Sequence, residues 1–166
     1  AEIAIKAALT GHLVLSTLHT NDAPSTVSRM LNMGIEPFLI TAALNAIVAQ
    51  RLARRICDEC KEPIDVNVQT LTEIQVPEEK IGNFQAYKGM GCSRCSETGF
   101  KGRIAIYEVM LATDALKEMV LNGASTAELK GEAIRLGMRT LRQSAVRKMI
   151  EGTTTVDEVL RISAAD

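Results

Sequence analysis

Apolar and polar positions recur with clear periods in residues 1–56, and these periods predict short helices around one strand. Residues 3–9 are rich in Ala and Ile, which favours a short helix that ends at Gly11. Residues 12–17 (His-Leu-Val-Leu-Ser-Thr) are typical of a mostly buried strand in a parallel sheet. Helical spacing returns over residues 25–33.

Another helix is predicted after Pro37. Residues 47–56 fit either its continuation or a separate strand, and periodicity leaves both interpretations open. Residues 102–111 give the best strand pattern in the chain, because they are β-branched and aromatic with polar residues at alternate or terminal places. The rest of the chain is predicted to be helical. The helices expected there run from Asp114 to Gly123, Ser125 to Leu136, Thr140 to Ile150 and Thr155 to Ile162.

The distribution of charge divides the chain into three predicted regions. Residues 1–56 carry five basic and three acidic side chains, and residues 102–166 carry nine of each. Residues 57–101 carry five basic and eight acidic side chains, are rich in Gly and polar residues, and contain two cysteine pairs. The middle region is therefore predicted to be an insert between two better-packed regions.

Composition narrows the possible classes of function. With 166 residues, of which 46% are hydrophobic, the chain is expected to fold around a core. A formal net charge of −1 and the absence of Trp argue against a nucleic-acid-binding surface. The chain has no initiator Met or signal-peptide pattern, and no apolar stretch approaches the roughly 20 residues that span a bilayer. We expect a cytoplasmic chain without a transmembrane segment, and part of a longer protein.

Two Cys-x-x-Cys pairs, Cys57 with Cys60 and Cys92 with Cys95, are the strongest chemical signal in the sequence. Each pair suits a tight knuckle that presents two thiolates, and two knuckles complete a tetrahedral zinc shell. Four protein ligands leave no open position for a substrate water, so the predicted zinc is structural. Two disulfides or a thioredoxin-like redox motif are alternatives. The first needs an oxidising compartment, and the second leaves one pair unexplained.

His12 and His19 lie at the two ends of the strand predicted near the start of the chain. Ligands of open α/β sheets bind beyond the carboxyl ends of strands, where Thr17 and His19 are expected, and their donors suit a phosphate. A structural role for each histidine remains the alternative. A Ser-His-Asp hydrolase arrangement of Ser16, His19 and Asp22 is rejected because no Gly-x-Ser-x-Gly turn is present. The chain also has no Gly-Lys dipeptide and therefore no Walker A loop.

Five stretches of the chain resemble the secretion ATPase superfamily, in the order found in that family. They are residues 10–23, similar to its His box; residues 49–60, with Ala-Gln-Arg-Leu before the first cysteine pair; residues 92–108, with the second pair before Thr-Gly-Phe and Tyr-Glu; and the motifs at residues 137–141 and 152–155. Within the superfamily the chain is most similar to type IV pilus assembly ATPases and type II secretion ATPases. Pilus retraction ATPases share the His box but lack the tetracysteine insert.

The resemblance implies an α/β fold with three regions. Residues 1–56 would be the C-terminal part of a RecA-like P-loop ATPase core with the His box, residues 57–101 a tetracysteine zinc-binding insert, and residues 102–166 a core strand plus a helical C-terminal subdomain. The family's Walker motifs precede the His box, so residues 1–166 alone are expected to hydrolyse no ATP.

The resemblance also implies an activity and partners for the whole protein. It would be a homo-hexamer that hydrolyses ATP with Mg²⁺ and drives type IV pilus assembly by pilin polymerisation, with type II protein secretion as the alternative. The implied partner is an inner-membrane platform protein, and the implied location is cytoplasmic and peripheral to the inner membrane. A stand-alone zinc-organised interaction module without nucleotide chemistry is the rival hypothesis.

Individual residues receive roles from the same resemblance. His19 would sense the γ-phosphate, with Thr17 as a supporting donor, and His12 would hold the neighbouring acidic motif in place. Arg51 and Arg54 would contact nucleotide or a neighbouring subunit. A solvated or ion-paired face is the alternative for the two arginines.

Overall fold

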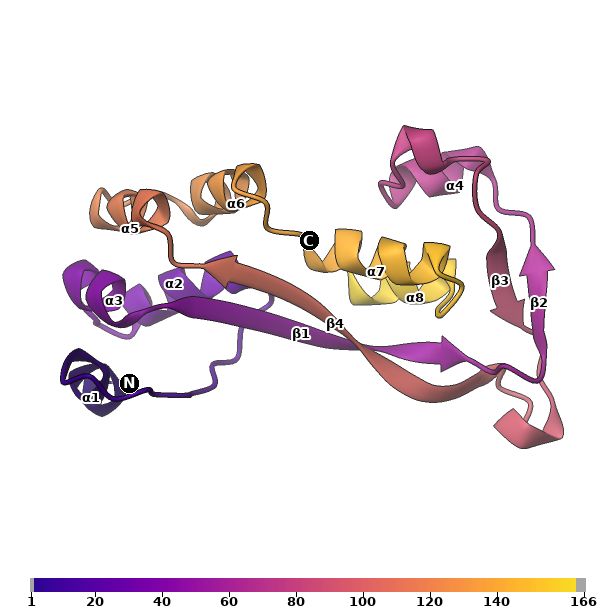
Figure 1. Cartoon of the computed structure of the whole chain (residues 1–166), viewed down its shortest axis with the longest axis horizontal. Coiled ribbons are helices and arrows are strands. Elements are labelled where there is room, and N and C mark those ends of the chain that lie inside the picture. Colours follow the sequence, from indigo (N-terminus) through magenta and orange to yellow (C-terminus); the bar gives the residue numbers. More distant parts are fainter. Residues whose placement is uncertain (1, 164–166) are drawn as a thin grey trace. The chain divides into compact units, whose positions relative to one another are not determined.

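The computed structural model describes residues 2–163, which form helices and two small sheets (Figure 1). Two long strands, β1 (Ala46–Ile56) and β4 (Phe100–Leu111), pair with each other. The chain divides into two compact units, and the division falls inside both of these strands. Unit 1 comprises residues 1–49 and 108–138, and unit 2 comprises residues 50–107 and 139–166.

The described part of unit 1 is mainly helical. Its helices are α1 (Glu2–Leu9), α2 (Ala23–Asn32), α3 (Pro37–Ala43), α5 (Asp114–Leu121) and α6 (Thr126–Arg135). Helix α2 packs against α6, and α3 packs against α5. Buried apolar side chains from α2, α5, α6 and both strands form the core, which includes Val27, Ile47, Met110, Leu116 and Leu129. Burial of such side chains is the main source of stability for short helices of this kind.

Side chains at the helix starts explain where these helices begin. Asp22 accepts the N–H of Ser25 at the start of α2, and Thr113 caps α5. Ser125 and Glu128 form a reciprocal capping box at the start of α6. Each cap satisfies an amide that has no partner inside its helix, so the sequence specifies these boundaries locally.

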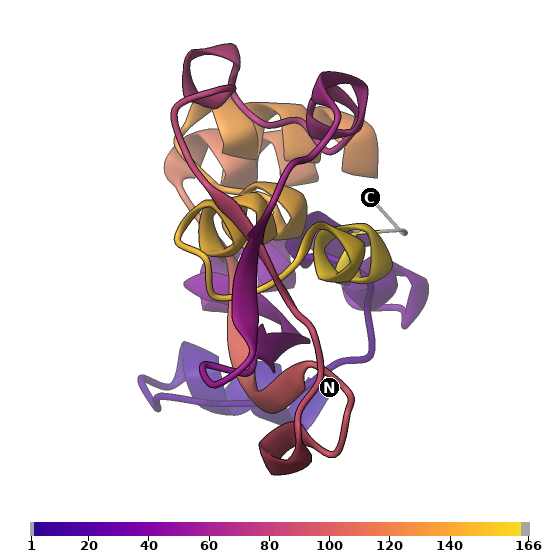
Figure 2. The ribbon, with the colours of Figure 1, turned by 90° about the vertical axis from the view of Figure 1, so that its right-hand side faces the viewer.

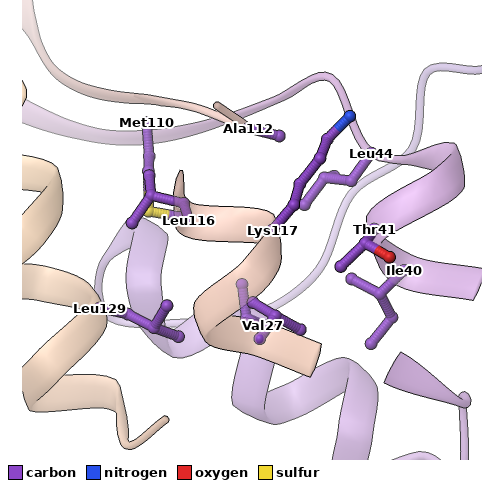
Figure 3. A pocket seen from close by; sticks show the side chains of 10 residues that line it. Val27, Ile40, Thr41, Leu44, Met110, Ala112, Leu116, Lys117 and Leu129 are labelled. Carbon is purple, nitrogen blue, oxygen red and sulfur yellow. The ribbon is translucent and has the colours of Figure 1, made fainter. Parts of the chain in front are cut away.

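A small apolar cavity of about 20 Å³ lies inside unit 1 (Figure 3). Its lining comes from α2, α3, α5, α6 and the end of β4. Figure 3 shows Val27, Ile40 and Leu129 around it, with Lys117 as the only charged side chain among the labelled residues. A cavity of this size and polarity holds at most one water molecule. It is therefore a packing gap and offers no room for a nucleotide.

Unit 2 combines a β-hairpin with a pair of packed helices. Its further elements are β2 (Lys61–Ile64), α4 (Val68–Glu73), η1 (Glu78–Lys80), β3 (Ala86–Gly89), η2 (Ser93–Cys95), α7 (Leu141–Ile150) and α8 (Val156–Ile162). Strands β2 and β3 are antiparallel, with Lys61 opposite Gly89 and Ile64 opposite Ala86. Helices α7 and α8 lie side by side in both views (Figures 1 and 2). Their apolar faces pack with Ala53, Ile106 and the residues around α4.

The turn between α7 and α8 covers the outer edge of β1 in unit 2. The N–H of Ile56 donates to the Thr153 carbonyl at 3.0 Å, and the Thr154 hydroxyl donates to the Arg54 carbonyl at 2.8 Å. The N–H of Arg54 donates to a Glu158 carboxylate oxygen at 2.6 Å. The Leu52 carbonyl accepts from the Arg161 guanidinium at 2.9 Å. Polar backbone groups along this edge are therefore paired without another strand.

Most of the elements predicted from the sequence are confirmed. The predicted helices correspond to α1, α2, α3, α5, α6, α7 and α8, each within a few residues, and the strand at residues 102–111 corresponds to β4. The open alternative for residues 47–56 is decided in favour of a strand, because the chain leaves the helical conformation at Leu44. The hairpin β2–β3 and helix α4 were not predicted.

The strand predicted at residues 12–17 is wrong. Residues 12–20 form no helix or strand, and Leu13 and Leu15 are 84% and 87% exposed. A buried strand needs neighbouring strands and a cover for its apolar side chains. Among residues 2–163 the two sheets are β1–β4 and β2–β3, and neither includes this segment. No helix within that range is long and apolar enough to cross a bilayer.

Candidate metal centre and His box

The folding of residues 57–99 gathers the four cysteines at one end of unit 2. Cys57 directly follows β1, Cys60 directly precedes β2, Cys92 follows β3 and Cys95 ends η2. All four Sγ atoms lie within 4.8 Å of one another. The two Cys-x-x-Cys pairs therefore come together as predicted, although 31 residues separate Cys60 from Cys92 in the sequence.

The sulfur–sulfur distances fit a tetrahedral metal site. The Sγ atoms are 3.9 Å apart for Cys57 and Cys92, 3.9 Å for Cys60 and Cys95, and 3.7 Å for Cys92 and Cys95. A Zn–S bond of about 2.3 Å in a regular tetrahedron gives edges of about 3.8 Å. A disulfide would need about 2.05 Å, and the four cysteines are free. The geometry favours shared metal coordination over either disulfide pairing.

Backbone N–H groups point at two of the sulfurs. The N–H of Gly91 donates to Cys60 Sγ at 3.3 Å, and those of Cys92 and Gly99 each donate to Cys95 Sγ at 3.2 Å. Such donors stabilise thiolates and orient them, as outer-shell hydrogen bonds do in metal sites. Cys95 is therefore supported by the backbone of its own knuckle, and Cys60 by the backbone just before the second knuckle.

Two of the thiols, those of Cys60 and Cys95, differ in acidity. Burial raises the pKa of Cys95, but the N–H groups of Cys92 and Gly99 outweigh this and lower it to about 6. Burial raises the pKa of Cys60 to about 12, with hydrogen bonds to the neighbouring sulfurs adding to the effect and the Gly91 N–H opposing it. Without a cation one thiolate is thus favoured, while its neighbour is held protonated. A divalent cation supplies the charge that lets the remaining thiols ionise.

Close backbone contacts fix the two halves of the cluster against each other. The N–H of Cys57 donates to the Gly99 carbonyl at 3.0 Å, and that of Met90 donates to the Cys60 carbonyl at 2.9 Å. A Cβ on Gly89 would collide with the Gly99 carbonyl, so a larger residue does not fit there. The absence of side chains at these two glycines is therefore a requirement of the cluster.

Charged residues near the cysteines have partners of their own. Arg94 pairs with Glu59 at 2.9 Å across the two knuckles, and Arg55 pairs with Asp58 at 3.0 Å. The Lys61 ammonium lies over the Tyr87 ring at 4.2 Å from its centroid. Gly152 approaches this pair so closely that a Cβ there would lie 2.8 Å from Lys61 Nζ. The hairpin β2–β3 thus packs closely against the turn between α7 and α8.

The predicted His box lies in unit 1 and is irregular. His12, Thr17 and His19 are all exposed. His12 Nδ1 lies 3.1 Å from the Thr10 hydroxyl at the end of α1. The Thr20 hydroxyl lies 2.9 Å from the hydroxyl of Thr26 in α2. The structure therefore anchors both ends of the segment and leaves its middle, with Thr17 and His19, open to solvent.

Arg54 has close partners inside unit 2. Its guanidinium lies 2.9 Å from a Glu158 oxygen and 4.1 Å from the centre of the Phe100 ring. Glu158 is completely buried and also pairs with Arg161 at 2.7 Å. Burial raises the Glu158 pKa, but donors from Arg161 and Arg54 outweigh this and lower it to about 2. Sequence reasoning missed this buried glutamate, because a polar residue in an amphipathic helix does not reveal its side-chain partners.

A model of the family described as "Type II/IV secretion system protein" matches residues 1–161. The chain belongs to this family. The type IV pilus assembly ATPase PilB of Myxococcus xanthus is 64% identical over 100% of this chain, which covers 30% of that protein. The PilB of Thermus thermophilus is 47% identical over 96% of the chain and 18% of its own length. The type II secretion system protein HxcR of Pseudomonas aeruginosa is 39% identical over 98% of the chain and 31% of its own length.

The fold of this chain is similar to that of a solved structure. The crystal structure of the pilus retraction motor PilT with bound ADP matches with a TM-score of 0.62 and 21% sequence identity. The match covers 98% of this chain and 35% of the motor chain. At this identity the likeness establishes an α/β fold similar to that motor and nothing of its activity. The chain spans roughly a third or less of the relatives described above.

Proposed function

We propose that the chain is part of a motor ATPase that drives type IV pilus assembly. The observation that carries this proposal is 64% identity to a pilus assembly ATPase over the whole chain, against 39% and 40% for two type II secretion proteins of Pseudomonas aeruginosa. The proposal includes a RecA-like core that binds ATP and Mg²⁺ in the full-length homo-hexamer. It also includes attachment to a platform protein on the cytoplasmic face of the inner membrane.

Within this motor, residues 1–56 are proposed to be the C-terminal part of the RecA-like core. Residues 57–101 would be the zinc-binding insert, and residues 102–166 a core strand with a helical C-terminal subdomain. His19 senses the γ-phosphate, with Thr17 as a supporting donor, and His12 holds an acidic motif elsewhere in the protein. The exposure of His19 and Thr17 supports these roles, because both side chains are available to a ligand or a neighbouring element. A hydrogen bond made to ATP and lost with ADP would bias the closure of a subunit.

Arg51 and Arg54 are proposed to contact nucleotide or a neighbouring subunit. For Arg54, a guanidinium that is half exposed while bound to Glu158 supports a role at a subunit boundary more than one at a phosphate. Its stacking on Phe100 and its ion pair fix its orientation, which suits a surface that presents one geometry to a partner.

The four cysteines are proposed to hold a structural zinc ion. Four thiolates whose Sγ atoms all lie within 4.8 Å of one another suit a tetrahedral shell, so the ion would supply no catalytic water. Its contribution would be to join the end of β1, the start of β4 and the hairpin β2–β3. Chelation should therefore disorganise this end of unit 2 without acting on nucleotide chemistry directly.

A chimera tests the function. Residues 1–166 replace the matching region of PilB in Myxococcus xanthus, and surface pili and ATP hydrolysis are measured. The same exchange is made in the type II secretion system protein E of Pseudomonas aeruginosa, with secretion as the readout. We expect pili and ATPase activity from the first chimera, little secretion from the second, and no ATPase activity from residues 1–166 alone.

Two results would contradict the proposal. A zinc-loaded first chimera that accumulates normally but assembles no pili, beside a second chimera that restores secretion, identifies the chain with type II secretion. Failure of both zinc-loaded chimeras favours the stand-alone interaction module. Within an active first chimera, a His19→Ala variant that hydrolyses ATP at the parental rate overturns the sensing role alone.

A further inference from the structure

The segment that carries His19 ends in a compact group of buried polar contacts. Two residues after His19, the chain reaches Asn21 and then Asp22, whose exposed fraction is 8%. One Asp22 oxygen accepts the N–H of Ser25 at 2.9 Å, and the other lies 3.4 Å from Lys130 Nζ on α6. Burial raises the pKa of Asp22, but the Ser25 and Lys130 donors outweigh this and leave it below its usual range. The carboxylate form is therefore the one present at neutral pH.

Glu108 on β4 completes this group. Its side chain belongs to a residue that is 0% exposed, and its Oε1 accepts the N–H of Ala23 at 2.7 Å across 85 residues of sequence. Ala23 is the first residue of α2, whose N-terminal amides have no partner within the helix. Two carboxylates therefore meet the positive end of this helix dipole, one from the local turn and one from a distant strand.

A buried carboxylate is an expensive way to close a helix end. Taking a carboxylate out of water costs more than burying an apolar side chain, unless hydrogen bonds and charges compensate it. Asp22 caps the Ser25 N–H from the local turn, whereas Glu108 reaches the Ala23 N–H from a distant strand. What it adds is a fixed link between β4 and the point where the His19 segment joins α2.

We propose that Glu108 is a positioning residue for His19. It holds the end of segment 12–22 in place, so that the exposed imidazole stays at a fixed distance from the phosphate that it senses. This inference rests on the proposed ATPase function. Asp22 and Lys130 assist by fixing the turn around the same point. The side chain of His19 is four residues before the Glu108 contact, so freedom at Ala23 becomes displacement at the imidazole.

The size of the effect follows from geometry. Displacement of a catalytic or sensing group by about 1 Å lowers rates by up to about 100-fold. Loss of the Glu108 contact loosens one of several anchors, since the Thr20–Thr26 contact and the Asp22 cap remain. A fall in kcat of about tenfold, with little change in KM for ATP, is therefore expected for Glu108→Ala.

The test uses the active full-length chimera with Glu108→Ala, Glu108→Gln and Val27→Ala. Glu108→Gln keeps an oxygen acceptor for the Ala23 N–H and should retain kcat within about threefold of the parent. Val27→Ala is the matched control, because Val27 is a buried residue of the same helix that contacts the apolar core rather than its N-terminus. It should lower thermal stability as Glu108→Ala does, while leaving kcat unchanged below the unfolding temperature.

Amide hydrogen exchange supplies a second measurement that is independent of catalysis. We expect Glu108→Ala to accelerate exchange in peptides covering residues 12–24, and Val27→Ala to leave residues 12–20 as in the parent. We also expect the Glu108→Ala/His19→Ala double variant to be no slower than His19→Ala, because a positioning residue has no effect once the group that it positions is removed.

The outcomes separate this inference from the proposed function. Parental exchange over residues 12–24 in Glu108→Ala overturns the anchor, and a loss of kcat that multiplies with that of His19→Ala overturns the positioning role. An active parent whose Glu108→Ala variant keeps its kcat overturns the positioning role and leaves the proposed function intact. A properly folded chimera without ATPase activity overturns the proposed function and the link to catalysis, while exchange still decides whether Glu108 holds the segment.

Discussion

Glu108 in unit 1 and Glu158 in unit 2 are both 0% exposed, yet they are compensated in different ways. Glu108 accepts the Ala23 N–H at the start of α2, close to a segment whose middle is exposed. Glu158 accepts from the Arg54 backbone and from two guanidinium groups, beside an edge whose Leu52 and Arg54 carbonyls are also paired. The contact of Glu108 lies at one end of a solvent-exposed segment. The contacts of Glu158 cover part of the edge of β1.

The two units also differ in the contacts that stabilise them. Unit 1 relies on apolar packing between helices, with the caps at its helix starts. Both units contain polar contacts between segments far apart in the sequence, and unit 2 adds the four-cysteine cluster. We infer that unit 2 responds to metal removal and to acid, and that unit 1 responds to changes at the ends of its exposed segment.

Loss of a cysteine should have the largest effect. Cys57→Ser in the full-length protein removes one of four thiolates, so we expect zinc to be lost and the unfolding temperature to fall by more than about 10 °C. Zinc content is measured beside thermal unfolding. Ser93→Ala, which changes a residue within the second knuckle that is not a ligand, should keep both. A metal-free Cys57→Ser protein with parental stability would falsify the structural role of zinc.

Glu158→Ala should have the next largest effect. It leaves the Arg54 N–H and two guanidinium groups without their acceptor, and we expect a loss of about 2 kcal/mol, reduced from a fully buried pair because both arginines are half exposed. Amide exchange in β1 and α8 reports the loss. Arg147→Ala is the control, since its pair with Glu151 is on the surface. Equal effects of the two variants would remove the distinction drawn for Glu158.

The lowered pKa of Glu158 also predicts that the stability of unit 2 depends on pH. The pKa of this glutamate is lowered to about 2 in the folded chain, below the usual value of 4.5, so its stabilising contribution is complete above about pH 4.5. This contribution declines as the pH falls from about 4.5 toward 2, where the folded-state carboxylate takes up a proton. The stability difference between the parent and Glu158→Gln should therefore shrink between pH 6 and pH 3 in exchange measurements. A constant difference over that range would contradict the assignment.

Alanine substitutions at two glycines should have the smallest effect on stability. Together they separate the cost of a close side-chain contact from the cost of backbone strain. Gly152 and Gly137 have φ values of +71° and +100°, and only Gly152 has Lys61 and Tyr87 within reach of an added Cβ. We expect Gly137→Ala to cost about 1 kcal/mol through backbone strain, and Gly152→Ala to cost about 1 kcal/mol more through the contact. Thermal unfolding measures both. Identical losses would show that the hairpin does not press on this turn.

The sequence predicted the helices well because their signals are local. Ser125 and Glu128 specify the start of α6, and Thr155 specifies the start of α8, without help from distant residues. The Cys-x-x-Cys pairs were also readable, because each knuckle is a local turn whose thiolates need a second pair. The cluster then confirmed the expected pairing of the two motifs.

The failures concern information that is not local. Residues 12–17 have the composition of a buried strand, yet among residues 2–163 no strand pairs with them, so they remain exposed. Glu108 and Glu158 could not be recognised as buried from the sequence, since the backbone N–H groups that they accept, those of Ala23 and Arg54, lie 85 and 104 residues away. Whether a charged side chain is buried depends on which distant residues the fold brings next to it. The period of apolar positions does not predict those contacts.

The covered edge of β1 bears on how the protein behaves at high concentration. An open strand edge invites pairing with another molecule and is a common origin of aggregation. Between Leu52 and Ile56, four backbone groups on this edge are already paired by the α7–α8 turn and by Glu158 and Arg161. A single hydroxyl, that of Thr154, accounts for one of these pairings, so Thr154→Val would free a carbonyl on this edge. The turn therefore occupies backbone groups that would otherwise be open to a strand of another molecule.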